Sequence, residues 1–158
     1  MRVLVVFFAN TGQTRYVASE MARRCGGELE EVLDARPHAG ACEALRYIWD
    51  SLRKKTPPIE AAIKDAADYD LVILCTPVWA RRVSSPVRSY IQQNAQRFKR
   101  VAFFCTDDGW RGDKRVFAEM ARLCAREPVA TFVMSEPILA EPMQYEPLQQ
   151  FMSCLATA

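Results

Sequence analysis

The sequence predicts an α/β fold in which a five-stranded parallel sheet is covered by helices on both faces. Three observations lead to this prediction: apolar runs alternate with segments of helical periodicity, each run is continuously apolar, and the helical segments carry capping residues at their ends. A continuous apolar run suits a strand that is buried on both faces. Parallel neighbours need a crossover segment, which is usually a helix. The expected architecture is therefore a three-layer α/β/α arrangement.

Five segments are predicted to form the strands. Four are rich in Val, Ile, Leu and Phe, and they span residues 2–8, 70–76, 100–106 and 129–134. The fifth, at residues 28–34, is shorter and more charged, which favours a position at the edge of the sheet.

Five segments with apolar residues at helical spacing are predicted to form helices. They span residues 13–25, 42–55, 86–98, 113–124 and about 145–155. The first ends at Gly26-Gly27, and the third begins with Ser85 as N-cap followed by Pro86.

The predicted helix at residues 42–55 has its apolar residues on one stripe. These are Leu45, Ile48, Trp49 and Leu52. Such a stripe normally faces the core, so we expect Trp49 to be buried there rather than to contact a ligand.

Length and composition indicate one domain over residues 1–158. The formal net charge of +2 gives no argument for a nucleic-acid partner or an anionic membrane. The 6 cysteines are scattered without a CxxC pair, which favours reduced, mostly buried thiols and a cytoplasmic location. The run MRVLVVFFA lacks the features of a signal peptide, and no run approaches the ~18 apolar residues of a membrane span.

The loops that follow the strands are the candidate binding site, because ligands of open parallel sheets bind beyond the carboxyl ends of the strands. These loops are residues 9–14, 77–85 and 107–113. The first joins a strand to a helix, and the start of a helix attracts anions such as phosphate. Thr11 could alternatively serve only as a helix cap. GxxxxGK[ST] and GxGxxG patterns are both absent, which gives no support for a triphosphate loop or a dinucleotide fingerprint.

Two of these loops contain a tryptophan outside the apolar periodicity. Trp79 lies in the second loop, and Trp110 lies in the third between Gly109 and Gly112. Together with a phosphate-binding loop, two indoles suggest a planar aromatic phosphomonoester held between them.

Three segments together resemble the flavodoxin-like family, in the same order along the whole chain. They are FFANTGQT, YDLVILCTPVWA and VAFFCTDDGWRG. The resemblance implies the strand order 2-1-3-4-5 and a bound FMN, with its ring against Trp79. The residues implied to bind it are Asn10, Thr11, Gly12, Gln13 and Thr14 for the phosphate, Thr76, Pro77, Val78, Trp79 and Ala80 beside the ring, and Thr106, Asp107, Asp108, Gly109 and Trp110 at the pyrimidine edge.

The sequence departs from the family pattern at three places, one of which is Gln13 in place of the commoner Asn, a change that leaves the backbone N–H contacts possible. Ala9 stands where the family usually has Ser or Thr, and the loss of one hydrogen bond should cost about 0.5–1.5 kcal/mol of binding. Electron-carrying flavodoxins are typically acidic around the flavin, whereas the loops of this chain contain Arg81, Arg82 and Arg111 against Asp107 and Asp108. If these cations approach the ring, they would make the reduced flavin a weaker reductant. The alternative is that all three lie in solvent.

Three functions are consistent with these features. The first is an FMN-binding electron carrier that serves a redox partner protein. The second is an NAD(P)H-dependent FMN or quinone reductase, and the third is an interaction module that has the fold but binds no flavin. We expect a monomer or homodimer that binds no nucleic acid.

Overall fold

The computed structural model describes residues 1–10, 12–37, 40–107, 113–135 and 146–157. Strands and helices alternate along the chain as the sequence predicts. In order, they are β1 (Val3–Phe7), α1 (Gly12–Cys25), β2 (Glu28–Glu31), α2 (Glu43–Leu52), β3 (Leu71–Trp79), β4 (Arg82–Val83), α3 (Ser85–Asn94), β5 (Val101–Asp107), α4 (Asp113–Cys124), β6 (Thr131–Ser135) and α5 (Glu146–Thr157).

The main sheet is parallel and has the strand order β2-β1-β3-β5-β6. The two-residue strand β4 lies off this path and pairs antiparallel with β3. Without β4, the order is the predicted 2-1-3-4-5, so the predicted fold class is confirmed. The charged strand β2 lies at one edge of this path, also as predicted.

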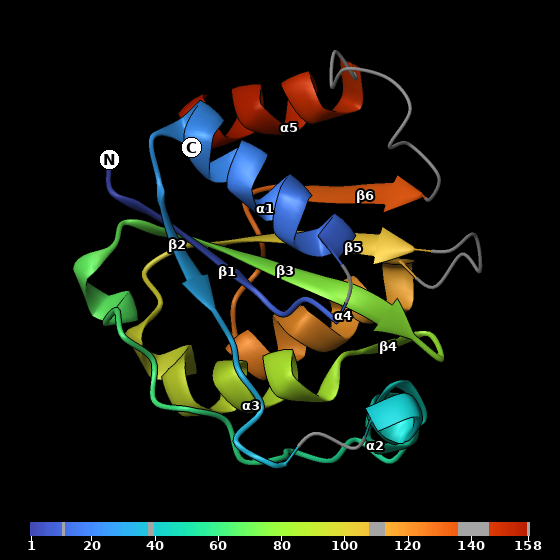
Figure 1. The fold of residues 1–158 in the computed structure, drawn as a ribbon. Helices are drawn as coiled ribbons and strands as arrows, with labels where there is room; N and C mark the ends of the chain where they lie inside the picture. Colours follow the sequence, from blue (N-terminus) through green and yellow to red (C-terminus); the bar gives the residue numbers. More distant parts are fainter. Residues whose placement is uncertain (11, 38–39, 108–112, 136–145, 158) are drawn as a thin grey trace.

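Helices cover both faces of the sheet (Figure 1). Helices α1 and α5 pack on one face, and α2, α3 and α4 lie on the other. Alternate residues of each strand point into the two cores: Val5 of β1 packs with α1, whereas Leu4 and Val6 pack on the opposite side. This double coverage is the physical reason for the continuously apolar strands.

The boundary between β3 and α3 differs from the prediction. Strand β3 continues through Pro77 to Trp79, because β1 ends its pairing at Cys75 and the missing N–H of Pro77 interrupts no ladder on that side. Helix α3 begins at Ser85 with Ser84 in the N-cap position, one residue before the predicted cap.

The prediction that Trp49 lies in the core is wrong. Helix α2 turns Tyr47, Asp50 and Ser51 inward, whereas Trp49 is 52% exposed. Asp50 and Ser51 are tolerated inside because each has a partner on another segment. Asp50 forms an ion pair of 2.7 Å with Arg36, and the Ser51 hydroxyl accepts a hydrogen bond of 3.1 Å from the backbone N–H at residue 85.

The cysteines are less uniformly buried than predicted. Cys75, Cys105 and Cys124 are buried, but Cys42 and Cys154 are exposed. Burial raises the pKa of the Cys124 thiol to about 12, which keeps it protonated and unreactive. Among the described residues, none of the helices has the length and hydrophobicity needed to cross a lipid bilayer.

Candidate functional site

The structure brings the strand ends that lead into the three predicted loops together at the carboxyl edge of the sheet. Phe8, directly after β1, contacts Trp79 edge to face, with ring centroids 5.7 Å apart. Pro77 of β3 is in register with Thr106 of β5. The start of α1, the end of β3 and the end of β5 are therefore neighbours in space, although they are far apart in sequence.

The first loop leads into α1, which begins at Gly12 and has no acidic residue in its first turn. A Cβ atom added at Gly12 would meet nothing within 4 Å, and the Gly12 backbone is not in the left-handed region. Neither backbone conformation nor packing against the described residues therefore requires a glycine here. Asn10 is exposed and Thr14 is buried, and the predicted residue Thr11 lies outside the described residues.

The second loop is a tight β-hairpin. Trp79 pairs with Arg82, so only Ala80 and Arg81 form the turn. Their φ angles are 50° and 58°, as a type I′ turn requires. A side chain with a Cβ atom is strained in this conformation, and such strain is typical of functional sites.

We predict that Ala80→Gly raises the free energy of unfolding by about 0.5–1 kcal/mol, because glycine adopts a positive φ without strain. Urea unfolding measures the change. The matched control is Ala95→Gly, since Ala95 has a right-handed φ of −52° and should lose stability from the same substitution. Equal destabilisation by both variants would contradict the assignment of strain to the turn.

The base of the hairpin is held by a buried hydrogen-bonded pair. The Thr76 hydroxyl lies 2.9 Å from the Ser84 hydroxyl and accepts a hydrogen bond of 3.1 Å from the Ser84 N–H. Both side chains are 0% exposed. The predicted binding residue Thr76 thus uses its hydroxyl to position the hairpin.

A buried ion pair between α3 and α4 supports strand β4. Arg88 of α3 and Glu119 of α4 lie 2.8 Å apart, with side-chain exposures of 2% and 5%. The other oxygen of Glu119 accepts a hydrogen bond of 3.3 Å from the N–H of Val83 in β4. The sequence analysis missed both residues, since each lies within an amphipathic helix and has no pattern that marks it.

Trp79 is packed more closely than the sequence suggested. Its ring stacks on Tyr47 at 5.2 Å and 14°, and the indole contacts the larger core cluster. A planar ligand could therefore use only the opposite indole face. Tyr47 was missed because it lies on the side of α2 away from the apolar stripe.

The phenol of Tyr47 anchors this aromatic pair. Its hydroxyl donates a hydrogen bond of 3.1 Å to Glu43. Burial is the main cause that raises the pKa of Tyr47 to about 12, so the phenol stays neutral and keeps its donor near neutral pH.

The third loop follows β5, which ends at Asp107. Thr106 is buried, and Asp107 is in register with Ser135 of β6. The remaining predicted residues of this loop, Asp108, Gly109 and Trp110, lie outside the described residues, as does Arg111.

Arg81 and Arg82 bring positive charge to the hairpin. Arg81 is exposed and Arg82 is partly buried. Within the described part of the chain, neither side chain has a carboxylate within ion-pair distance. Both guanidinium groups are therefore available to an anion that approaches the hairpin.

A cavity of about 340 Å³ opens beside Asn10, between β1, β2 and α2. Aromatic residues Phe8 and Tyr47 contribute to its lining. Four carboxylates also line it: Glu31, Asp34, Glu43 and Glu60. The Arg15 guanidinium also lines the cavity but pairs with Glu31 at 2.6 Å, so carboxylates still outnumber cations there and disfavour a phosphate, even though the cavity adjoins the first loop.

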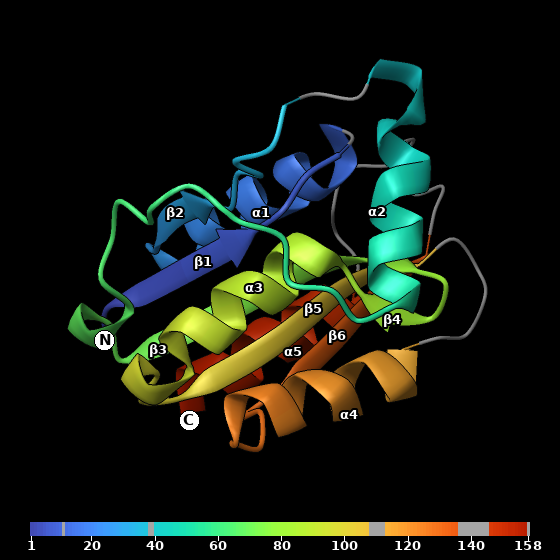
Figure 2. The same ribbon diagram turned by 90° about the horizontal axis from the view of Figure 1, so that it is seen from below.

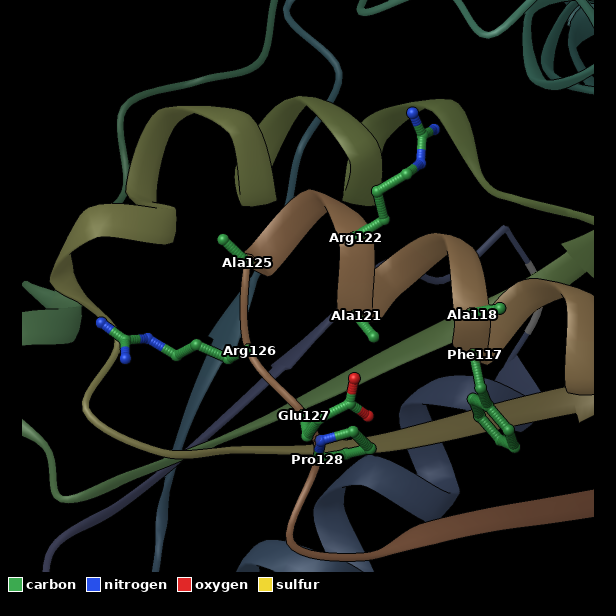
Figure 3. Close-up of a pocket in the computed structure, with 8 residues that line it drawn as sticks. All are labelled: Phe117, Ala118, Ala121, Arg122, Ala125, Arg126, Glu127 and Pro128. Carbon is green, nitrogen blue, oxygen red and sulfur yellow. The ribbon is translucent and has the colours of Figure 1, made fainter.

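A second cavity, of about 570 Å³, lies along α4 and the segment that leads into β6 (Figure 3). Its lining includes Phe117, Arg122, Arg126 and Pro128. It contains none of the predicted site residues, and Pro128 precedes β6, which places this end of it at the amino edge of the sheet. It is therefore separate from the candidate site.

No protein-family model and no curated protein matches this sequence. Solved structures with a similar fold do exist. A flavoprotein from Lactobacillus acidophilus NCFM, solved in complex with FMN, is 20% identical and has a TM-score of 0.72, covering 84% of this chain and 92% of its own. The two-electron reduced flavodoxin of Megasphaera elsdenii is 16% identical and has a TM-score of 0.60, covering 99% of both chains.

A flavodoxin from Streptococcus pneumonia TIGR4 is also similar, with 15% identity, a TM-score of 0.58 and 99% coverage of both chains. The chain therefore has a flavodoxin-like fold.

Proposed function

We propose that this chain is an FMN-binding redox protein that carries electrons through the bound flavin. The observation that supports this most directly is the convergence of the α1 start, the β3–β4 hairpin and the end of β5 at one edge of the sheet. The similar flavoprotein from Lactobacillus acidophilus was solved with FMN, which adds support from outside this chain.

The start of α1 has the chemistry that a phosphate dianion needs. The first turn of a helix presents N–H groups and a partial positive charge, and no carboxylate within this turn opposes an anion. The open space at Gly12 would let the phosphate approach the backbone. We propose that Asn10, Thr11, Gly12, Gln13 and Thr14 hold the phosphate.

The hairpin supplies a rigid surface for a flat ring. Tyr47 stacks on one face of the Trp79 indole and Phe8 contacts the ring edge to face. These contacts hold the opposite face of the indole in a fixed orientation. We propose that the ring lies against this face. The contributing residues are Thr76, Pro77, Val78, Trp79 and Ala80 from the hairpin, with Thr106, Asp107, Asp108, Gly109 and Trp110 at the other side.

The flavin itself would supply one- and two-electron chemistry, and the protein would supply position and electrostatics. The hydrogen bonds between Thr76 and Ser84 would keep the hairpin in one conformation despite the strain in the Ala80-Arg81 turn. The Arg81 and Arg82 guanidinium groups would favour a negative charge on the ring.

We predict that Gly12→Asp weakens FMN binding at least ~100-fold, because a carboxylate would then occupy the phosphate position. The same change should leave the free energy of unfolding unchanged or raise it by about 0.3–1 kcal/mol, since an acid near a helix start is favourable. FMN titration with flavin and tryptophan fluorescence measures the affinity, and urea unfolding measures the stability.

Riboflavin, which lacks the phosphate, provides the control. The unaltered protein should bind FMN more tightly than riboflavin, and Gly12→Asp should abolish this preference. If FMN quenches no fluorescence in the unaltered protein, the flavin function is wrong and the interaction module is favoured. If Gly12→Asp binds FMN normally, the phosphate lies elsewhere.

A second prediction concerns the redox potential. Arg82→Gln should lower the potential of the hydroquinone couple, because each ~1.4 kcal/mol of lost stabilisation of the reduced anion lowers a one-electron potential by ~59 mV. Spectroelectrochemical titration gives the value. Arg97→Gln is the control, since Arg97 pairs with Asp65 at the amino edge of the sheet and should not change the potential.

The exposed cations favour a second candidate function, an NAD(P)H-dependent FMN or quinone reductase. Arg81 and Arg82 could bind a phosphate of a pyridine nucleotide above the ring. Stopped-flow mixing of the FMN-loaded protein with NADPH distinguishes the two functions. Rapid bleaching of the flavin without a protein partner indicates a reductase, and its absence favours the carrier.

A further inference from the structure

We propose that the outward face of α2 binds the same face of a second copy of this chain, forming a homodimer in which the two α2 helices lie antiparallel. We call this surface the α2 apolar face. It consists of Leu45, Ile48, Trp49 and Leu52.

The α2 apolar face is unusually exposed for its composition. Leu45 is 67% exposed, Trp49 52% and Leu52 48%. Contiguous apolar residues on a surface are typical of interaction sites. The side of α2 opposite them is already occupied by Tyr47, Asp50 and Ser51, so the helix cannot rotate to bury the stripe without exposing that side.

The spacing suits a pair of helices. Residues 45, 48 and 52 repeat with intervals of three and four, which is the a-d-a spacing of a two-helix seam. Trp49 flanks that seam. Figures 1 and 2 both show α2 at the outside of the molecule beside β4, where a second helix could approach it.

The charges along α2 favour a second copy over a different partner. The helix has Glu43 in its first turn, where it already contacts Arg46 and Tyr47 and keeps 21% of its side chain exposed, and Arg53, Lys54 and Lys55 follow the last residue of the helix. A twofold axis across the α2 apolar face would place the acidic end of each helix opposite the basic end of the other. The antiparallel helix dipoles would attract as well, and a net charge of +2 produces little repulsion between copies.

The cations at the helix end are only partly neutralised within the chain. Lys55 lies 3.3 Å from Asp50, and the Arg53 guanidinium lies 4.3 Å from the centre of the Trp49 ring. Lys54 is exposed and has no carboxylate within ion-pair distance among the described residues. It is therefore available to Glu43 of a second copy.

The expected dimer is weak. A helix of 10 residues is about 15 Å long, so one helix per copy buries less than the roughly 800 Å² per partner of a standard interface. We expect a dissociation constant in the micromolar range, and association that needs no flavin.

Sedimentation velocity between about 1 and about 100 µM protein tests the dimer, in the presence and absence of FMN. The unaltered protein should shift from monomer to dimer over this range, and Trp49→Glu should weaken association at least tenfold. Ile63→Glu is the matched control, because Ile63 is 90% exposed but lies outside α2 and should leave association unchanged. Circular dichroism and urea unfolding of each variant verify that the fold is intact.

Charge reversal tests the antiparallel arrangement. Lys54→Glu should weaken the dimer by placing two carboxylates opposite each other, and adding Glu43→Gln, which removes one carboxylate but keeps an acceptor for Tyr47, should restore part of the affinity. A protein that stays monomeric at about 100 µM overturns the proposal, as does a dimer that Trp49→Glu leaves intact. A double variant no tighter than Lys54→Glu overturns the antiparallel arrangement.

Discussion

Glu119→Ala is expected to lower the free energy of unfolding by about 3–5 kcal/mol, because it leaves the buried guanidinium of Arg88 without its partner. Arg88 and Glu119 are only 2% and 5% exposed, so water cannot replace the lost carboxylate. The N–H of Val83 in β4 also loses its acceptor. Urea unfolding followed by circular dichroism measures the loss, which is a large part of the stability of an ordinary domain.

A double variant separates the energetic effect of the buried charges from that of lost side-chain packing. Arg88→Met combined with Glu119→Leu removes both charges and keeps the volume similar, so it should be more stable than Glu119→Ala alone. Glu119→Gln keeps an acceptor for the Val83 N–H and should show an intermediate loss. If the double variant is as unstable as Glu119→Ala, the buried charge is not the cause.

The second large effect concerns two tryptophans, of which Trp79 packs against the core and Trp49 is exposed. Trp79→Ala should cost about 3 kcal/mol of stability, because the indole packs on Tyr47 and Phe8 and contacts the core. It should also weaken FMN binding at least ~10-fold, through loss of the stacking surface.

Trp49→Ala is the matched control, since it deletes the same side chain from a site that is 52% exposed. Its cost should be at most about 1 kcal/mol when both variants are monomeric, and FMN binding should be unchanged. Trp79→Phe keeps an aromatic face and should recover most of the stability. Equal effects of the two alanine variants would contradict the packing described for Trp79.

The elements of the sheet were predictable because their signal is local. Continuous apolar runs marked β1, β3, β5 and β6, whereas the charged β2 was predicted as an edge strand. Val17 and Met21 at helical spacing marked α1 as a helix with one buried face. The two-residue strand β4 was not predictable, since Arg82 and Val83 acquire strand geometry only by folding back on β3.

The candidate site was predictable at the level of its loops but not of its supports. The residues from Asn10 to Thr14 and those around Trp79 follow strands, and the carboxyl edge of a parallel sheet brings such loops together. The supports are long-range contacts: Tyr47 lies 32 residues from Trp79, and Glu119 lies 36 residues from Val83. Nothing in the local sequence connects them.

Helix α2 shows most clearly which feature could not be predicted from the sequence, namely the face that is buried. By itself the sequence predicted an amphipathic helix over residues 42–55, because helical periodicity depends only on spacing, and residues 43–52 form it. Which face turns inward was decided by tertiary structure. Asp50 forms an ion pair with Arg36, Ser51 accepts a hydrogen bond from the backbone N–H at residue 85, and Tyr47 stacks on Trp79. The polar side of the helix therefore has partners within the fold, and the apolar side lies at the surface. Periodicity identifies two faces, but only the partners available in space decide which of them is buried.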